Sequence, residues 1–160
     1  MIIFEKYLDK FIEMSDLENI KLRVLGNVEE LPKNIKEKIE KMYERTKDNT
    51  GLNFNIAFNY GGRDELVRAT KNIAQDVLNK KINIEDITEQ TIADNLYTKG
   101  QEDPDLVIRT SGELRISNFL PWQIAYSEFL FLDKYWPEFT NEDIDRAIEV
   151  YSNRHRRKGK

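Results

Sequence analysis

The feature that most constrains this fold is the alternation of two hydrophobic periods along the chain. Apolar residues recur at every second position in 52–58 and at every third or fourth position in 63–79. Alternating strands and helices with short connectors are typical of a parallel sheet covered by helices. We therefore expect an α/β fold with one mostly parallel sheet, flanked by helices on both faces.

The expected elements follow the period of each segment. Strands are predicted at about 20–25, 52–58, 105–109 and 128–132, and helices at about 4–11, 33–49, 63–79, 88–96 and 140–151. We expect the last strand to be buried on both faces, because its apolar residues are consecutive. We expect three aromatic residues to lie in the core: Trp122, Tyr126 and Trp136. Since no linker is evident, residues 1–160 are predicted to form one domain.

Composition excludes several kinds of active site. The chain has no cysteine, and its single histidine, His155, lies in a basic C-terminal tail. A thiolate nucleophile, a Ser-His-Asp triad and a histidine-rich metal site are therefore not supported. No P-loop or dinucleotide-binding glycine motif is present. The charged start and the lack of a long apolar run predict a soluble, cytoplasmic protein.

Charge is unevenly distributed. The net charge is −4, but five of the last seven residues are basic, which leaves 20 basic against 29 acidic residues elsewhere, or −9. Such an acidic body predicts no nucleic-acid partner, because that binding needs a broad basic surface. The tail is either a solvated helix end or a contact to an anionic surface such as a membrane.

Two loops that follow predicted strands are candidates for ligand binding, since ligands bind at the carboxyl ends of parallel strands. The first contains Gly61, Gly62 and Arg63. Paired glycines at a helix N-terminus allow backbone N–H groups to approach an anion. The alternative is an ordinary tight turn.

The second loop lies between two strands and carries Arg109, Arg115 and Ser117. Two arginines six residues apart among hydroxyl side chains suit a diphosphate, because they donate charge-assisted hydrogen bonds. Glu128 could help to bind Mg²⁺ beside that diphosphate. The alternatives are arginines that pair with surface carboxylates and a Glu128 that caps or forms a salt bridge. The residues alone indicate a phosphate-binding α/β domain and leave open whether it uses Mg²⁺.

The same residues resemble a known family. Residues 103–123, DPDLVIRTSGELRISNFLPWQ, are similar to the C-terminal signature of cis-prenyltransferases, most of all to that of undecaprenyl diphosphate synthases. The likeness continues through AYSE at 125–128 and YWPEF at 135–139. Residues 59–65, NYGGRDE, resemble a second signature of the family.

The resemblance implies a function and a role for each residue. Such enzymes add isopentenyl diphosphate to an allylic diphosphate and build a polyprenyl diphosphate lipid carrier. Arg109, Arg115 and Ser117 match positions that bind isopentenyl diphosphate, and Glu128 matches a carboxylate associated with Mg²⁺. Gly61, Gly62 and Arg63 match supporting positions. The family usually works as a homodimer, and its lipid product or the basic tail implies a peripheral membrane contact.

The chain also departs from the family pattern. The Asp-Gly-Asn-x-Arg-Trp stretch, which supplies the catalytic aspartate and the allylic-diphosphate loop, does not occur in this sequence. The resemblance therefore implies an N-terminally truncated form of the fold, with no catalytic residue of its own and no activity in isolation. The alternative is a non-catalytic accessory subunit that pairs with a complete enzyme. The presence of Arg109, Arg115, Ser117 and Glu128 favours the transferase.

Overall fold

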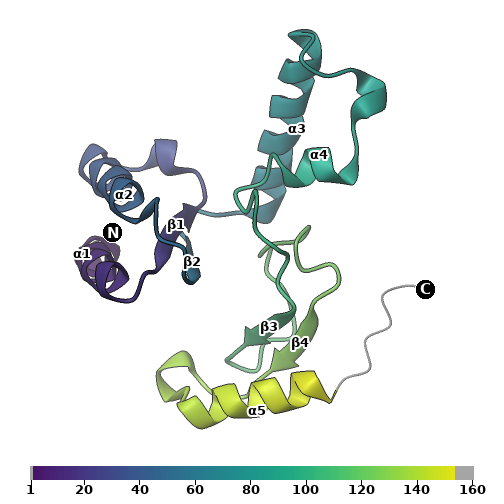
Figure 1. The fold of residues 1–160 in the computed structure, drawn as a ribbon. Coiled ribbons are helices and arrows are strands. Elements are labelled where there is room, and N and C mark those ends of the chain that lie inside the picture. The colour runs from purple at the N-terminus through teal and green to yellow at the C-terminus, as the bar shows by residue number, and fades with distance from the viewer. Residues whose placement is uncertain (1, 154–160) are drawn as a thin grey trace. The chain divides into compact units, whose positions relative to one another are not determined.

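The computed structural model describes residues 2–153, and every strand and helix predicted from the sequence is present in it. Three short 3-10 helices, η1 to η3, add to them. In chain order the elements are α1 Ile2–Leu17, β1 Lys21–Leu25, η1 Val28–Glu30, α2 Lys33–Thr46, β2 Asn53–Ala57, α3 Gly62–Leu78, η2 Ile84–Asp86, α4 Glu89–Ala93, β3 Leu106–Arg109, β4 Glu128–Phe131, η3 Trp136–Glu138 and α5 Asn141–Ser152 (Figure 1).

The chain forms two compact units, Met1–Lys99 and Gly100–Lys160, here called unit 1 and unit 2. Each unit contains one pair of parallel strands with helices beside it, so the α/β class and the parallel pairing are confirmed. That residues 1–160 form a single family domain stays a prediction.

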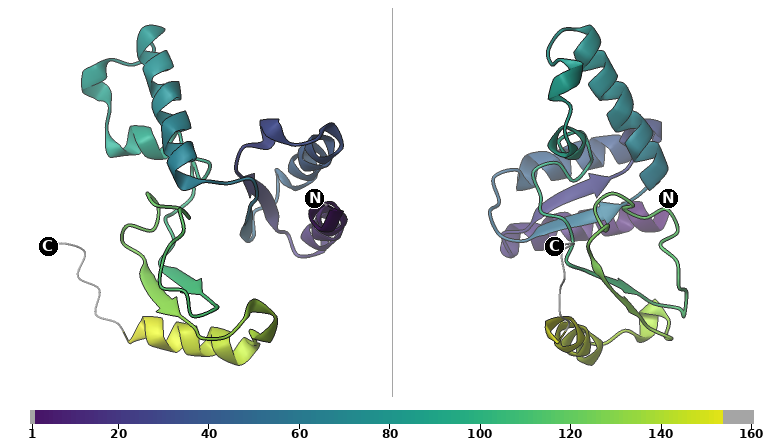
Figure 2. Two further views of the ribbon diagram at one scale, coloured as in Figure 1. Left: turned by 180° about the vertical axis from the view of Figure 1, so that it is seen from behind. Right: turned by 90° about the vertical axis from the view of Figure 1, so that its right-hand side faces the viewer.

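Unit 1 is built on the parallel pair of β1 and β2, whose register runs from Lys21 opposite Asn53 to Leu25 opposite Ala57. Helices α1 and α2 lie on the same side of this pair (Figures 1 and 2). The alternation of the sequence explains why, since the side chains of alternate β1 residues turn toward the helices. The core cluster joins residues of α1, β1 and α2 and one residue that precedes α2: Leu8, Ile12, Leu22, Val24, Leu31, Ile35, Ile39 and Met42.

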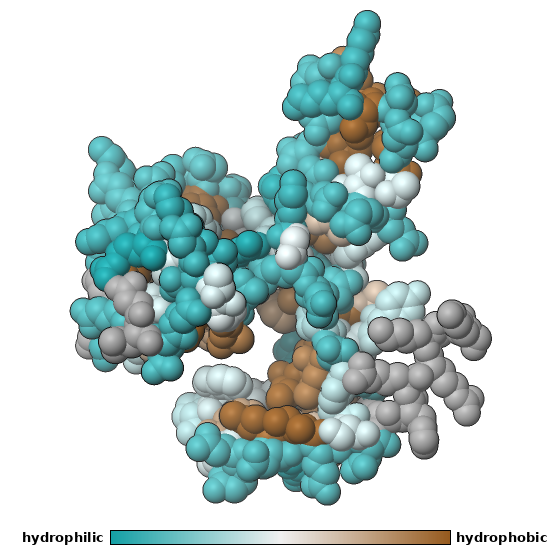
Figure 3. Space-filling model, in the orientation of Figure 1, coloured by the Kyte–Doolittle hydropathy of each residue, from teal (hydrophilic) through white to brown (hydrophobic). Residues whose placement is uncertain are grey.

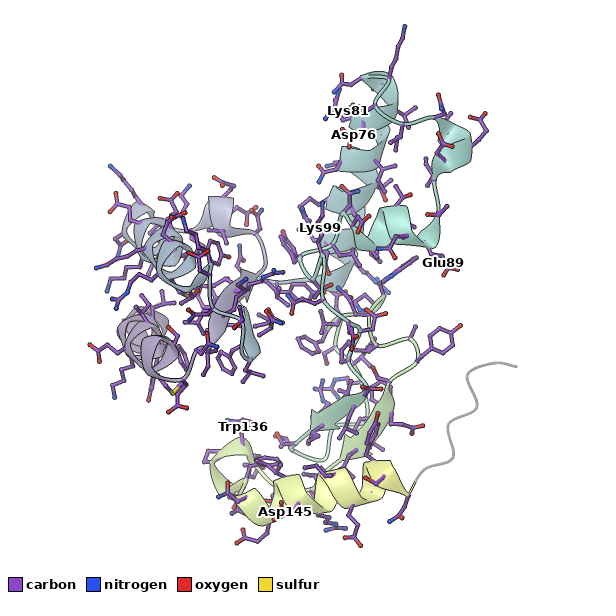
Figure 4. All side chains as sticks on the ribbon, viewed as in Figure 1. Asp76, Lys81, Glu89, Lys99, Trp136 and Asp145 are labelled. Atoms are coloured by element: carbon purple, nitrogen blue, oxygen red, sulfur yellow. The ribbon has the colours of Figure 1, made fainter. Side chains whose placement is uncertain are left out.

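The second half of unit 1 is the helical pair α3 and α4. Helix α4 begins after Thr88, whose side chain accepts a hydrogen bond from the backbone N–H of Thr91. This N-cap satisfies one of the amide donors that a helix start leaves without a partner. At the far end of α3, Lys81 and Asp76 form an ion pair of 2.7 Å across the turn (Figure 4).

Unit 2 holds β3 and β4, which pair in parallel with Leu106 opposite Glu128 and Arg109 opposite Phe131. Helix α5 lies beside this pair (Figures 1 and 2). It is fastened by an ion pair of 2.7 Å between Lys134, in the segment after β4, and Asp143 in its first turn.

Two expectations about the sheet are wrong for the described residues. The four strands form two separate two-stranded sheets rather than one. The period of a segment predicts a strand but does not predict its partner. Between β2 and β3 the chain runs through the long segment 58–105, which contains α3 and α4. Strand β4 is half-buried rather than buried on both faces. A two-stranded sheet has little area to cover, so a consecutive apolar run does not guarantee burial.

The prediction of a core position is also wrong for two of the three aromatic residues. Tyr126 is 82% exposed and Trp136 is 67% exposed. Trp136 lies in η3, just before α5, and its ring stacks on Phe139 with centroids 5.0 Å apart (Figure 4). Other exposed apolar side chains of α5 contribute to the hydrophobic surface of this unit (Figure 3).

Two further predictions concern the membrane. Within residues 2–153, no helix combines the length and the apolar character that crossing a bilayer requires. The basic C-terminal tail lies outside the described residues, so its predicted contact with an anionic surface stays a prediction, as does the cytoplasmic location.

Candidate functional site

Arg109 is the last residue of β3, at the carboxyl end of the parallel pair in unit 2. The chain that follows folds back on this end, because Ser111 N–H donates to the Lys134 carbonyl at 2.8 Å and Gly112 N–H donates to the Leu132 carbonyl at 3.0 Å. The strand therefore ends in a loop held by backbone hydrogen bonds.

This loop has an unusual backbone. Residues with positive φ cluster in it: Ser111, Gly112, Ser117, Asn118 and Leu120. Non-glycine residues in this region each store strain of about 1–3 kcal/mol, which the surrounding structure has to offset. At Gly112 a Cβ atom would lie 3.0 Å from Asp133 Oδ1, so the loop approaches the next segment closely. Such a strained, tied-down loop is typical of a functional site.

The loop and the two strands enclose a cavity of 120 Å³ that brings Arg109 and Arg115 together. The Nε atom of Arg109 is buried, and in the described part of the chain it has no hydrogen-bond partner. A buried donor without a partner costs about 1–3 kcal/mol, which makes this arginine a candidate for binding an acceptor. The other lining residues are all apolar: Val107, Ile108, Ile116, Phe119, Ile124, Phe129 and Phe131.

The structure does not gather all the predicted residues at this cavity. Arg115 forms an ion pair with Glu113 on the loop itself. Ser117 is exposed, with φ of 47°, and it is not among the described residues that line the cavity. Its role in binding stays a prediction.

Glu128 opens β4, where its N–H donates to the Asp105 carbonyl at 2.9 Å. Among residues 2–153, no group of three or more His, Cys, Asp or Glu side chains could hold a metal ion. Mg²⁺ commonly uses one or two carboxylates and completes its shell with water and substrate phosphates. A single carboxylate such as Glu128 is compatible with that kind of site, and the described donor set does not fit a metal enclosed by protein alone. The role of Glu128 in binding Mg²⁺ stays a prediction.

The first candidate loop, in unit 1, follows β2 and meets the loop that follows β1. Asn59 Nδ2 donates to the Asn27 carbonyl at 2.9 Å, and Asn27 N–H donates to the Asn59 carbonyl at 3.0 Å. Between them, Gly26 has φ of +138°, and a Cβ there would lie 2.0 Å from the Phe58 carbonyl oxygen. The carboxyl ends of both strands are thus locked together by backbone contacts.

The two adjacent glycines lie at the start of α3, as predicted, and their role in ligand binding stays a prediction. Gly61 has extended backbone with φ of −144° and precedes α3, and Gly62 is buried as the first residue of that helix. The left-handed residue of the loop is Asn59, with φ of 49°. The side chain of Arg63 is exposed at the helix start.

Sequence reasoning missed a buried carboxylate that supports this loop. Glu65 is 1% exposed. Its Oε2 accepts from the Tyr60 hydroxyl at 2.6 Å, and its Oε1 accepts from the Tyr97 N–H at 2.6 Å. The available signal was a glutamate on the same helical face as Ala69 and Ile73, where an apolar residue is expected.

Comparison with known proteins decides the family. The family model described as "Putative undecaprenyl diphosphate synthase" matches residues 1–159. The chain belongs to the undecaprenyl diphosphate synthase family. It is 49% identical over 158 residues to an isoprenyl transferase of Streptococcus agalactiae serotype V and 46% identical over 159 residues to one of Clostridium tetani. These alignments cover 96% and 99% of this chain but only 63% and 62% of the relatives, so the chain spans less than two thirds of their length.

Solved structures agree with this membership. Lavandulyl diphosphate synthase from Lavandula x intermedia, crystallised with dimethylallyl diphosphate, is 32% identical and has a TM-score of 0.93. A probable undecaprenyl diphosphate synthase from Campylobacter jejuni is 34% identical and has a TM-score of 0.85. Each comparison covers 99% of this chain and 69% or 72% of the other. The α/β fold predicted from the sequence is that of this family.

Proposed function

We propose that this chain supplies the isopentenyl diphosphate site of a cis-prenyl chain-elongating transferase that makes a polyprenyl diphosphate. The observation that carries the proposal is the cavity on which Arg109 and Arg115 converge against an otherwise apolar wall. An isopentenyl diphosphate has the matching halves, a multiply charged diphosphate and a short hydrocarbon group.

Each part of the cavity has a separate task. The guanidinium groups of Arg109 and Arg115 donate to the diphosphate and offset its charge. Apolar side chains such as Phe119 and Ile124 take the hydrocarbon group, which orients it for reaction. Arg115 has to exchange Glu113 for the ligand, and this costs little because the pair is largely exposed.

Glu128 would hold Mg²⁺, which supplies charge neutralisation at a diphosphate when bound. The reaction needs a second, allylic diphosphate whose departure must be stabilised. A site that binds only isopentenyl diphosphate leaves the allylic diphosphate in solution, so the reaction between the two stays bimolecular. We therefore propose that the isolated chain makes no product. The full activity, the allylic partner and a homodimeric state all belong to this proposal.

The test is incorporation of radiolabelled isopentenyl diphosphate into butanol-extractable lipid, with farnesyl diphosphate and Mg²⁺. The chain alone should give no product. A fusion that carries the Asp-Gly-Asn-x-Arg-Trp segment of a relative should give product, and Arg115→Ala should abolish it. An exposed arginine of α5, Arg146→Ala, is the control that should leave incorporation unchanged. Robust incorporation by the unfused chain would overturn the account of where the chemistry lies.

A further inference from the structure

A second, larger cavity lies in unit 1 and is not explained by the proposed function. Its volume is 390 Å³, within the range of pockets that hold small metabolites. It runs along the edge of β1 that faces away from β2, and eight residues line it: Lys21, Leu22, Arg23, Val24, Tyr43, Thr46, Lys47 and Tyr97.

The lining is strongly cationic. It contains the ammonium groups of Lys21 and Lys47 and the guanidinium of Arg23, and no carboxylate is among the described residues that line it. Glu44, which lies outside the lining, offsets part of this charge through its ion pair with Lys47 at 2.8 Å. A concave site with an excess of positive charge on a net-acidic chain favours an anionic ligand.

The usual occupant of a strand edge is excluded here. An open edge accepts an extended peptide by backbone hydrogen bonding. At this edge, however, Leu22 N–H already donates to Thr46 Oγ1 at 3.3 Å. Val24 N–H donates to the Tyr43 hydroxyl, which in turn donates to the Val24 carbonyl, both at 3.2 Å. Side chains of α2 therefore take the hydrogen-bonding positions that a strand would use.

The two phenols that line the cavity, Tyr43 and Tyr97, do not reduce its positive charge. Burial raises the pKa of Tyr43, although the hydrogen bond from Val24 and the charge of Arg23 oppose the rise. Burial likewise raises the pKa of Tyr97. Both hydroxyls therefore stay protonated at neutral pH, so they add no negative charge to the cavity.

The far wall of the cavity is fixed by two contacts. Arg23 Nη1 donates to the Lys99 carbonyl at 3.0 Å, which ties the segment after α4 to β1. The Arg68 guanidinium stacks on the Tyr97 ring at 3.9 Å from its centroid. The cavity extends along β1 from its first residue, Lys21, to Val24, and the loop residues Gly26 and Asn59 are not among the described residues that line it.

We propose that this cavity binds a soluble phosphate ester, with Lys21 and Arg23 as the groups that hold the phosphate or diphosphate. Both cations project along one strand two residues apart, so their side chains lie on the same face. A small phosphate group can be bound by cationic side chains alone and needs no free backbone donor. The closed edge of β1 offers cationic side chains of this kind.

The test uses inorganic pyrophosphate, titrated by calorimetry into the full chain at fixed ionic strength. Arg109→Ala is the background, because it removes the proposed site in unit 2. On this background Lys21→Gln should weaken binding about tenfold, the loss of one charge-assisted hydrogen bond. Lys41→Gln removes the same charge from an exposed position on α2 that does not line the cavity, and it should have no effect.

Equal affinities for Lys21→Gln and Lys41→Gln would overturn the proposal. Amide shifts of Leu22 and Val24 upon pyrophosphate addition give a second readout, and their absence would also overturn it. Failure of the proposed function would appear differently, as Arg109→Ala without effect on isopentenyl diphosphate binding. Co-sedimentation with phosphatidylglycerol vesicles separates the two phosphate sources. If Lys21→Gln lost binding to the vesicles but kept its affinity for pyrophosphate, the cavity would be assigned to a lipid headgroup instead of a soluble ester.

Discussion

The two units of this chain differ in how their strands and their largest apolar side chains are packed. In unit 1, two helices and a strand interlock around side chains such as Ile39 that water does not reach. In unit 2, the strands are half-buried and large side chains such as Tyr126 and Trp136 face outward. Unit 2 is organised instead by its loop, with positive-φ residues and backbone hydrogen bonds around Arg109.

This difference teaches where stability and binding reside. A packed core stabilises through apolar burial, which is non-directional and tolerates few empty spaces. A binding loop has to keep charged donors available, so it cannot be covered completely. We therefore expect substitutions in the buried core of unit 1 to act on folding and those in the loop of unit 2 to act on the proposed binding of isopentenyl diphosphate.

The largest expected effect is that of Ile39→Ala. Ile39 is 0% exposed in the core of unit 1, so its truncation should lower the free energy of unfolding by about 4 kcal/mol through lost burial and a cavity. The matched change in unit 2, Ile148→Ala, should cost less than about 1 kcal/mol, because Ile148 is 56% exposed. Urea denaturation followed by circular dichroism measures both, and similar costs would remove the contrast between the units.

The next effect isolates a close backbone approach. Gly26→Ala should destabilise by about 3 kcal/mol, because the added methyl would meet the Phe58 carbonyl and the backbone would have to move. Gly100→Ala is the control, since Gly100 also has positive φ, of +74°, but has no atom within 4 Å of the added group. It should cost only about 1 kcal/mol. Equal losses in thermal unfolding would show that φ alone matters.

A smaller effect falls on binding rather than on folding. Arg109→Ala should weaken isopentenyl diphosphate binding by about 2 kcal/mol, because a charged hydrogen bond is lost at a partly buried site. Its unfolding free energy should change little, since its Nε has no hydrogen-bond partner in the described structure to lose. Calorimetry compares it with Arg146→Ala on α5. A variant that unfolds more easily but binds normally would reverse the roles assigned to the loop.

The smallest effect depends on pH. Lys134, foremost, and the Thr140 N–H hold the pKa of Asp143 below its usual value. A carboxyl with a lowered folded pKa stabilises above its unfolded pKa, and this contribution is lost as pH falls through the folded pKa. Asp143→Asn should therefore lower the urea midpoint at pH 7 and match the parent at strongly acidic pH. If the urea midpoints of Asp143→Asn and the parent still differed at strongly acidic pH, the effect of the substitution would come from shape and not from charge.

The sequence by itself determined the four strands and the five α-helices of residues 2–153 but not the three 3-10 helices, and it pointed to the family and the arginine loop. Local periodicity suffices for this because a segment's apolar face is set by its own residues, as the stripe of Ile35, Ile39 and Met42 on α2 shows. Arg109 and Arg115 stood out because their chemistry is visible in a short motif.

Only the tertiary structure decided which segments meet. It split the strands into two pairs, placed Arg109 and Arg115 on one cavity without Ser117, and buried Glu65 between Tyr60 and Tyr97. It also set the edge of β1 beside α2, where Lys21 and Arg23 line a cavity. Strand pairing, burial and cavities depend on contacts between residues that are far apart in the sequence. A local sequence pattern does not specify which distant segments come into contact.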